Sequence, residues 1–161
     1  MSLYLLLKVV HLLGVAVFAG VSFSNGFAAL SAARSGDLSR IAFAFDLVVR
    51  QDHALLVPSA LLLPVTGIWM AWLGGMPLWS GWLAEVLLLF LLLAILLALA
   101  IRLESRLHHL VDEALEIGEL PSEFHRVMGW WSLLGAVASV GIVAMIVVMT
   151  ARISLLDGGL G

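Results

Sequence analysis

The sequence predicts an all-α membrane protein, a four-transmembrane-helix up-down bundle with helical cytoplasmic extensions. Three observations carry this prediction. Of the 161 residues, 63% are hydrophobic and only 12% are charged, against about 25% charged in a typical soluble domain. The mean hydropathy is +1.14. The apolar residues gather in four continuous runs, each long enough to cross a bilayer core of about 30 Å as a helix.

The four runs are rich in Leu and Ala and do not alternate polar with apolar residues, which favours helices over barrel strands. We place the spans at about residues 3–33, 54–73, 79–101 and 129–151. The first run has no basic segment before it and is too long for a signal peptide, so we expect a retained helix. We assign residues 1–161 to a single four-helix integral membrane domain.

Composition excludes several classes of function. The chain has no cysteine, which excludes disulfides, Cys-ligated zinc, iron–sulfur clusters and covalent c-type haem attachment. The net charge of −3 indicates no polyanionic partner, so nucleic acid is not expected. The partners that we do expect are the lipid bilayer and a second copy of the chain or a membrane redox partner.

The basic residues predict the orientation. We call the end of the bundle that holds the N-terminus side A and the opposite end side B. Side B carries six arginines, whereas side A carries one lysine and one arginine. This excess places side B in the cytoplasm. We therefore predict a multi-pass protein of the inner (plasma) membrane with both termini outside, in the periplasm. The residues of side B are Arg34, Arg40, Arg50, Arg102, Arg106 and Arg126, and those of side A are Lys8 and Arg152.

Both connections on side B are predicted to be helical. Asp37 is placed to cap a helix with apolar residues at helical spacing, and Gly118 and Pro121 are placed to end the extension of the third span. We expect the two amphipathic extensions to pair. Their apolar positions are Leu38, Ile41, Phe45 and Val48 in the first and Leu103, Leu107, Leu110, Ala114 and Ile117 in the second.

Small residues and prolines predict how the spans pack. Small residues recur every four positions in the first two spans, which lets helix backbones approach closely. Pro58 and Pro64 are expected to disturb the second span and to free backbone carbonyls. The small residues are Ala16, Gly20, Ser24, Ala28 and Ala32 in the first span and Gly67, Ala71 and Gly75 in the second.

Three ionisable residues lie within the spans and are candidates for a cofactor site, because such residues are costly in lipid. At 1.5 Å per residue, Lys8, His11 and Glu85 lie roughly 8, 12 and 9 Å inside the side A boundary. A Lys8–Glu85 ion pair would neutralise both charges. The alternative is structural: Lys8 extends to the headgroups and Glu85 is its partner.

Methionines also gather towards side A. Met145 lies near the depth of His11, and imidazole with thioether suits haem iron or copper(I). We therefore name His11, Lys8, Glu85 and Met145 as candidate cofactor-binding residues, and His11, Met145 and Met149 as candidate metal ligands. The alternative is that the methionines fill gaps in the bundle. The five on side A are Met1, Met70, Met76, Met145 and Met149.

A second group of candidate ligands lies on side B. Glu104, His108, Asp112 and Glu116 recur every four residues, which suits either a metal site or, as we favour, a solvated helix face. His53 lies at the side B boundary, roughly 18 Å along the membrane normal from His11. A haem held by these two histidines is therefore not expected.

Beginning at Tyr4, the segment YLLLKVVHLLG, followed by FAG at Phe18, resembles the first helix of a bacterial four-helix integral membrane family of unknown function. The resemblance includes AARSGD ending at Asp37 and MIVVM near the end of the last span. More distantly, the first helix resembles the HemJ-type protoporphyrinogen oxidases and the CopD copper-resistance membrane domain. The HemJ-type resemblance implies that His11 is a haem ligand.

The chain departs from the HemJ-type pattern at two places. Glu85 and Val86 stand where that family has a required lysine, and SFSNG at residues 22–26 replaces its arginine and aromatic signature. Three hypotheses follow. The chain binds haem b in a membrane redox role, with His11 as one axial ligand and Met145 or another side A group as the second, Lys8 at a propionate and Glu85 tuning charge or relaying protons. Alternatively, it handles copper through His11 and the methionines, or it is a structural or accessory membrane protein without a cofactor.

Overall fold

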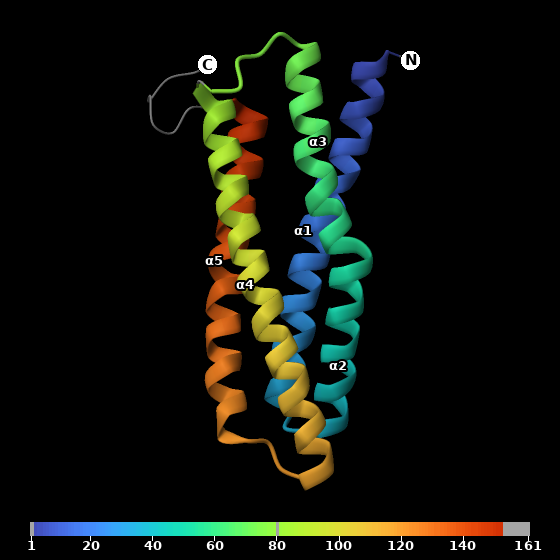
Figure 1. The fold of residues 1–161 in the computed structure, drawn as a ribbon, viewed down its shortest axis with the longest axis vertical. Coiled ribbons are helices and arrows are strands. Elements are labelled where there is room, and N and C mark those ends of the chain that lie inside the picture. The colour runs from blue at the N-terminus through green and yellow to red at the C-terminus, as the bar shows by residue number, and fades with distance from the viewer. Residues whose placement is uncertain (1, 80, 153–161) are drawn as a thin grey trace.

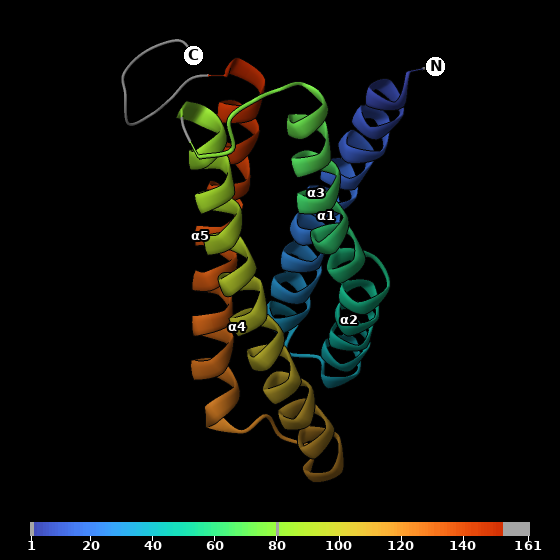
Figure 2. The same cartoon turned by 45° about the horizontal axis from the view of Figure 1, so that its top comes forward.

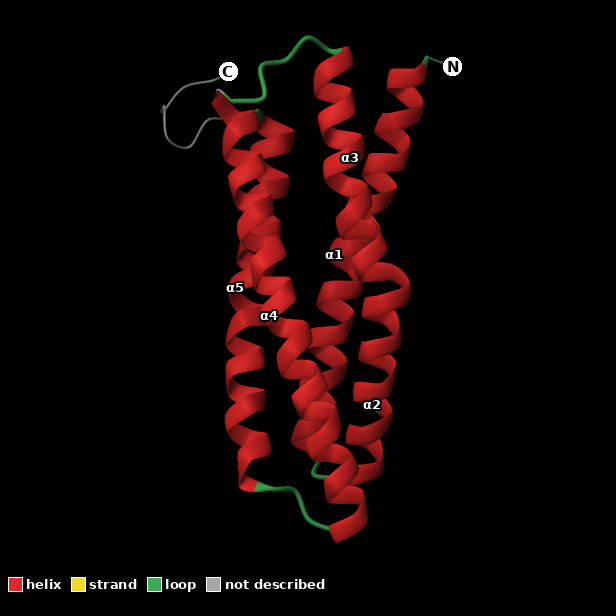
Figure 3. Cartoon of the chain, in the orientation of Figure 1, coloured by secondary structure: helices red, strands yellow, loops and turns green. Residues whose placement is uncertain are grey.

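The computed structural model describes residues 2–79 and 81–152, and within them it is helical with no strands (Figures 1 and 3). Four stretches are long and apolar enough to cross a membrane, which confirms the predicted four-helix membrane fold. The second stretch is a continuous helix formed by α2, η1 and α3. The elements are α1 (Leu3–Ser35), α2 (Leu38–Gln51), the π-helical turn η1 (Asp52–Leu56), α3 (Val57–Leu73), α4 (Gly81–Ile117) and α5 (Ser122–Ala151).

The helix ends on side B lie where the sequence predicts them, with one exception. The Asp37 carboxylate accepts hydrogen bonds from the backbone N–H groups of Ser39 and Arg40 and so begins α2. The extension of the third span continues to the end of α4 and stops at Gly118, whose φ of +86° favours glycine. The exception is α5, which begins at Ser122 instead of about residue 129, because its helix continues beyond the apolar run.

The core at side B joins the two extensions, as predicted. Apolar side chains from α2 and α4 pack together and against the first turn of α5, and all are almost completely buried. The rings of Phe45 and Phe124 meet edge to face with centroids 6.1 Å apart. The residues at the centre of this core are Ile41, Phe45, Val48, Leu107, Leu110, Val111 and Phe124.

Towards side A the bundle divides into two helix pairs. α1 packs along α3 and α4 packs along α5, whereas α3 has no extensive contact with α4 or α5. Both Figure 1 and its turned view in Figure 2 show the two pairs apart at this end.

The predicted packing of the small-residue stripe on α1 is confirmed only at its side B end. Ala32 is half-buried against the core there, whereas Ala16, Gly20 and Ser24 are exposed and α1 buries a neighbouring face that includes His11 and Phe18. Four-residue spacing defines a face of a helix but not the direction in which that face points. In α3 the predicted close packing of small residues is confirmed at two positions, because Ala71 is buried and Gly67 lies against His11. Gly75 lies beyond α3, which ends at Leu73.

The irregularity expected near the prolines is a π-helical turn. η1 ends two residues before Pro58, and the backbone N–H of Val57 donates to the carbonyl of Asp52, five residues earlier. Pro58 has no N–H and cannot donate to the carbonyl of Ala54. The wider turn therefore lies where the regular hydrogen-bond ladder is already interrupted.

Candidate functional site

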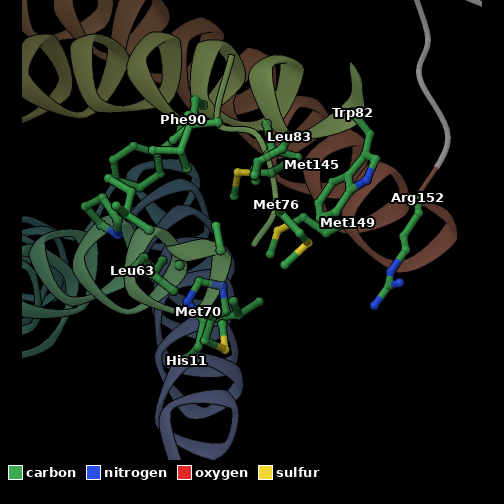
Figure 4. A pocket seen from close by; sticks show the side chains of 18 of the residues that line it. His11, Leu63, Met70, Met76, Trp82, Leu83, Phe90, Met145, Met149 and Arg152 are labelled. Atoms are coloured by element: carbon green, nitrogen blue, oxygen red, sulfur yellow. The ribbon is translucent and has the colours of Figure 1, made fainter. Parts of the chain in front are cut away.

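A cavity lies on side A between the two helix pairs (Figure 4). It encloses about 150 Å³, within about 880 Å³ of space unfilled by atoms when its open mouth is included. Most of its wall is apolar, and eight of its 19 lining residues carry a polar or sulfur-bearing side chain. These are Tyr4 and His11 of α1, Met70 of α3, Met76 of the α3–α4 link, Trp82 of α4, Met145 and Met149 of α5, and Arg152 at the end of α5.

The His11 ring is fixed by a hydrogen bond to α3. Its Nδ1 lies 2.8 Å from the hydroxyl oxygen of Thr66. That hydroxyl has one hydrogen, and the carbonyl oxygens of Leu62 and Leu63 lie 2.8 and 3.2 Å from it to accept that hydrogen. With that hydrogen directed to a carbonyl, the hydroxyl oxygen accepts from Nδ1–H, and in this tautomer Nε2 is the nitrogen with a lone pair.

This second nitrogen, Nε2, is buried and has no hydrogen-bond partner within the described part of the chain. Buried polar atoms are nearly always paired, so an unpaired one needs an explanation. The ring lies against Gly67, where an added Cβ would be 3.3 Å from Cε1 of His11. The absence of a side chain at Gly67 thus makes room for the imidazole at the cavity wall.

The four described side A methionines all line this cavity together with His11. Met145 is 4% exposed, so its thioether belongs to the interior of the bundle. In Figure 4, Met70 lies beside His11, while Met76, Met145 and Met149 come from the opposite side of the cavity. The fifth methionine of the prediction, Met1, lies outside the described residues. An imidazole and several thioethers form a soft, uncharged donor set.

The structure does not bring Lys8 or Glu85 to this cavity. Lys8 is on the exposed face of α1, and no ion pair between it and Glu85 is present among the described residues. The prediction of a Lys8–Glu85 ion pair is therefore wrong. Glu85 is 8% exposed on α4, and α1 has no extensive contact with that helix. Equal depth in the membrane does not make two helices neighbours.

Sequence reasoning missed three residues of the site. Thr66 orients His11, Trp82 lines the wall and Arg152 supplies a cation at the cavity. A polar residue directly before a glycine in an otherwise apolar span is the signal that singles out Thr66. The positions of Trp82 and Arg152 depend on which helices are neighbours, which no local pattern reveals.

The acidic stripe on α4 is not one solvated face. Glu104 is 5% exposed and accepts a hydrogen bond from the indole N–H of Trp131. His108 lies between two carboxylates, with Asp46 at 3.3 Å and Asp112 at 3.1 Å. Among the residues that the structure describes, no group of three or more His, Cys, Asp or Glu side chains is arranged to hold a metal ion.

Comparison with curated proteins and with solved structures gives no match. The family model described as predicted integral membrane protein (DUF2269) matches residues 5–153, which include all four spans and every side chain placed at the cavity except Tyr4. By this match, the chain belongs to the DUF2269 family of predicted integral membrane proteins.

Proposed function

We propose that this membrane protein binds haem b in the side A cavity and serves a membrane redox role. One observation carries the proposal: the buried Nε2 of His11, which has no partner among the described residues, at the wall of an apolar cavity. Metal-bound histidines commonly donate their other N–H to a protein group that fixes the tautomer, and Thr66 is such a group. His11 and Met145, which both line the cavity, would hold the iron.

The remaining wall suits a flat apolar macrocycle with two carboxylates. Trp82 and Phe90 contribute aromatic surface, and Arg152 offers a guanidinium to a propionate. In this proposal Arg152, and not Lys8 as the sequence suggested, is the basic residue that contacts a propionate. No extensive contact joins α3 to α4 or α5, so haem would be accommodated by separation of the two helix pairs on this side. Bound haem supplies one-electron transfer, tuned by the ligands and by burial.

Copper(I) is the second candidate, and the methionines favour it. Four thioethers and one imidazole line the same cavity, and soft sulfur ligands select Cu(I) among biological metals. Haem would use one or two of these five groups, whereas a copper-handling protein can use more of them. Copper transfer would then replace electron transfer as the role of the site.

The test is a visible spectrum of the detergent-purified protein, oxidised and reduced, after expression with added haem precursor. We expect a Soret band that His11→Ala abolishes. His109→Ala is the matched control, because His109 is an exposed histidine on α4, and it leaves the band unchanged. A Met145→Leu substitution shifts the reduced spectrum if Met145 is an axial ligand.

Elemental analysis after anaerobic Cu(I) loading separates the two candidates. Copper that is retained by the parent protein and lost in both His11→Ala and the double variant Met145→Leu/Met149→Leu, without any Soret band, assigns the site to copper. Absence of both haem and copper from a folded protein contradicts both proposals and leaves a structural or accessory role.

A further inference from the structure

Four buried polar side chains meet near side B, away from the cavity described above. They are Asn25 of α1, Asp52 of η1, Glu104 of α4 and Trp131 of α5, and none is more than 6% exposed. The amide Nδ2 of Asn25 donates to Oδ1 of Asp52 at 2.6 Å. The indole N–H of Trp131 donates to Oε1 of Glu104 at 2.9 Å.

The carboxyl groups of Asp52 and Glu104 line the same cavity and lie close enough to act on each other. Two neighbouring buried carboxylates repel each other, and one proton shared by the pair removes this repulsion and lets one carboxyl donate to the other. No lysine or arginine forms an ion pair with either group in the described chain. Apart from the pair itself, His53 is the titratable group of the described chain that acts electrostatically on Asp52. α1 and α5 contribute the uncharged Asn25 and Trp131.

A cavity of about 80 Å³ adjoins the pair. A buried water needs roughly 10–15 Å³ and two to four polar partners, so the cavity has room for water. Asn25 supplies one such partner, since its carbonyl Oδ1 is buried and lacks a hydrogen-bond partner among the described residues. The hydroxyls of Ser22 and Ser139 also line this cavity.

We infer that Asp52 and Glu104 form a proton-binding site, which holds one shared proton at neutral pH and exchanges it with water in the adjoining cavity. Three observations carry the inference: the burial of both carboxyl groups at one cavity, the lack of a basic ion-pair partner among the described residues and the unpaired Asn25 carbonyl. The π-helical turn that begins at Asp52 is of a kind often found at functional sites. The inference does not depend on haem or copper at side A.

Infrared spectroscopy of the purified protein at neutral pH tests this site. We expect a C=O band of a protonated carboxylic acid that shifts in D₂O and disappears in Glu104→Gln. The glutamine retains an oxygen for the Trp131 N–H and an amide N–H for Asp52, so the variant keeps the network. If this variant does not fold, the double variant Asp52→Asn/Glu104→Gln removes the band while replacing the charged pair with amides.

Two control variants assign the band. Glu85→Gln removes the other buried glutamate of the described chain, and Glu116→Gln removes an exposed glutamate on α4; both leave the Glu104-dependent band in place. The inference is overturned if no such band depends on Glu104, or if the band does not shift in D₂O. It is also overturned if NaCl stabilises the protein and equimolar choline chloride does not, because a metal cation would then neutralise the pair.

Discussion

The hydroxyl of Thr66, 2.8 Å from Nδ1 of His11, determines which nitrogen of that histidine faces the cavity as a free lone pair. Because the hydroxyl hydrogen is directed to a carbonyl of α3, Thr66 accepts from the imidazole and does not donate to it. One side chain on α3 thereby sets both the tautomer and the orientation of a side chain on α1. This relationship can be broken without changing the candidate ligand itself.

Replacing Thr66 with valine keeps the shape of the side chain and removes the hydrogen-bond acceptor. We expect the affinity for haem or Cu(I) to fall by roughly 10–100-fold, the usual effect of losing a group that orients a metal ligand. Titration of the purified protein with haem, and with Cu(I) against a competing chelator, measures the change. Thr66→Ser retains the hydroxyl and should bind as the parent does; equal affinity in Thr66→Val would mean that the bond has no part in ligation.

The glycine at position 67 is predicted to be required for the position of the imidazole. An added methyl group would lie 3.3 Å from His11 Cε1, so Gly67→Ala should displace the ring and weaken cofactor binding, with overpacking costing about 1–3 kcal/mol of stability. Gly20→Ala is the matched control, because nothing lies within 4 Å of the added carbon. The control should unfold no more easily than the parent, since alanine favours helices. A cofactor titration and a thermal melt of each variant test both expectations.

The spans and extensions were predictable because their signals are local. Apolar length identifies a span, and Asp37, Gly118 and the periodicity around Phe45 mark the helices of side B without knowledge of their neighbours. The grouping of His11 with the methionines of side A was also predictable, because the depth of a residue along a helix follows from counting residues.

Lateral arrangement could not be predicted in the same way. Lys8 and Glu85 share a depth, yet they lie on helices without extensive contact. Glu104 shares a four-residue spacing with His108, but it turns inward because Asp52 and Trp131 approach it from two other elements. Such partnerships depend on which helix faces which, and a pattern within one helix carries no information about that.

The core at side B is predicted to carry much of the stability. Phe45 is fully buried and contacts the rings of both Phe124 and Trp131, so Phe45→Ala should reduce the free energy of unfolding by about 3–5 kcal/mol. Phe43→Ala is the control, because Phe43 is 71% exposed on the same helix and its loss should change stability by no more than roughly 0.5 kcal/mol. Chemical denaturation of both variants in one detergent measures the difference, and equal effects would contradict the assignment of this core.

The cap at Asp37 predicts a pH dependence. The hydroxyl of Ser39 at 2.6 Å, and then the backbone N–H of Arg40, lower the pKa of the Asp37 carboxyl. The cap therefore contributes its full stability above the pKa of the unfolded chain and loses it as the pH falls through the lower pKa of the folded state. Asp37→Asn retains a capping side chain without a titrating group. Melting curves of both proteins should converge as the solution is acidified, and a constant difference would contradict this role.

The orientation in the membrane is the last prediction, and the lack of cysteine makes it straightforward to test. Six basic residues at side B against two at side A predict that side B faces the cytoplasm. Pro77→Cys places one thiol in the exposed α3–α4 link of side A, and Glu119→Cys places one in the exposed α4–α5 link of side B. A membrane-impermeant maleimide added to intact cells should label the first variant, whereas the second should react only after permeabilisation. The reverse pattern would put the His11 cavity near the cytoplasm and the Asp52–Glu104 pair near the outside, and the source of any copper, electrons or protons would have to be reassigned accordingly.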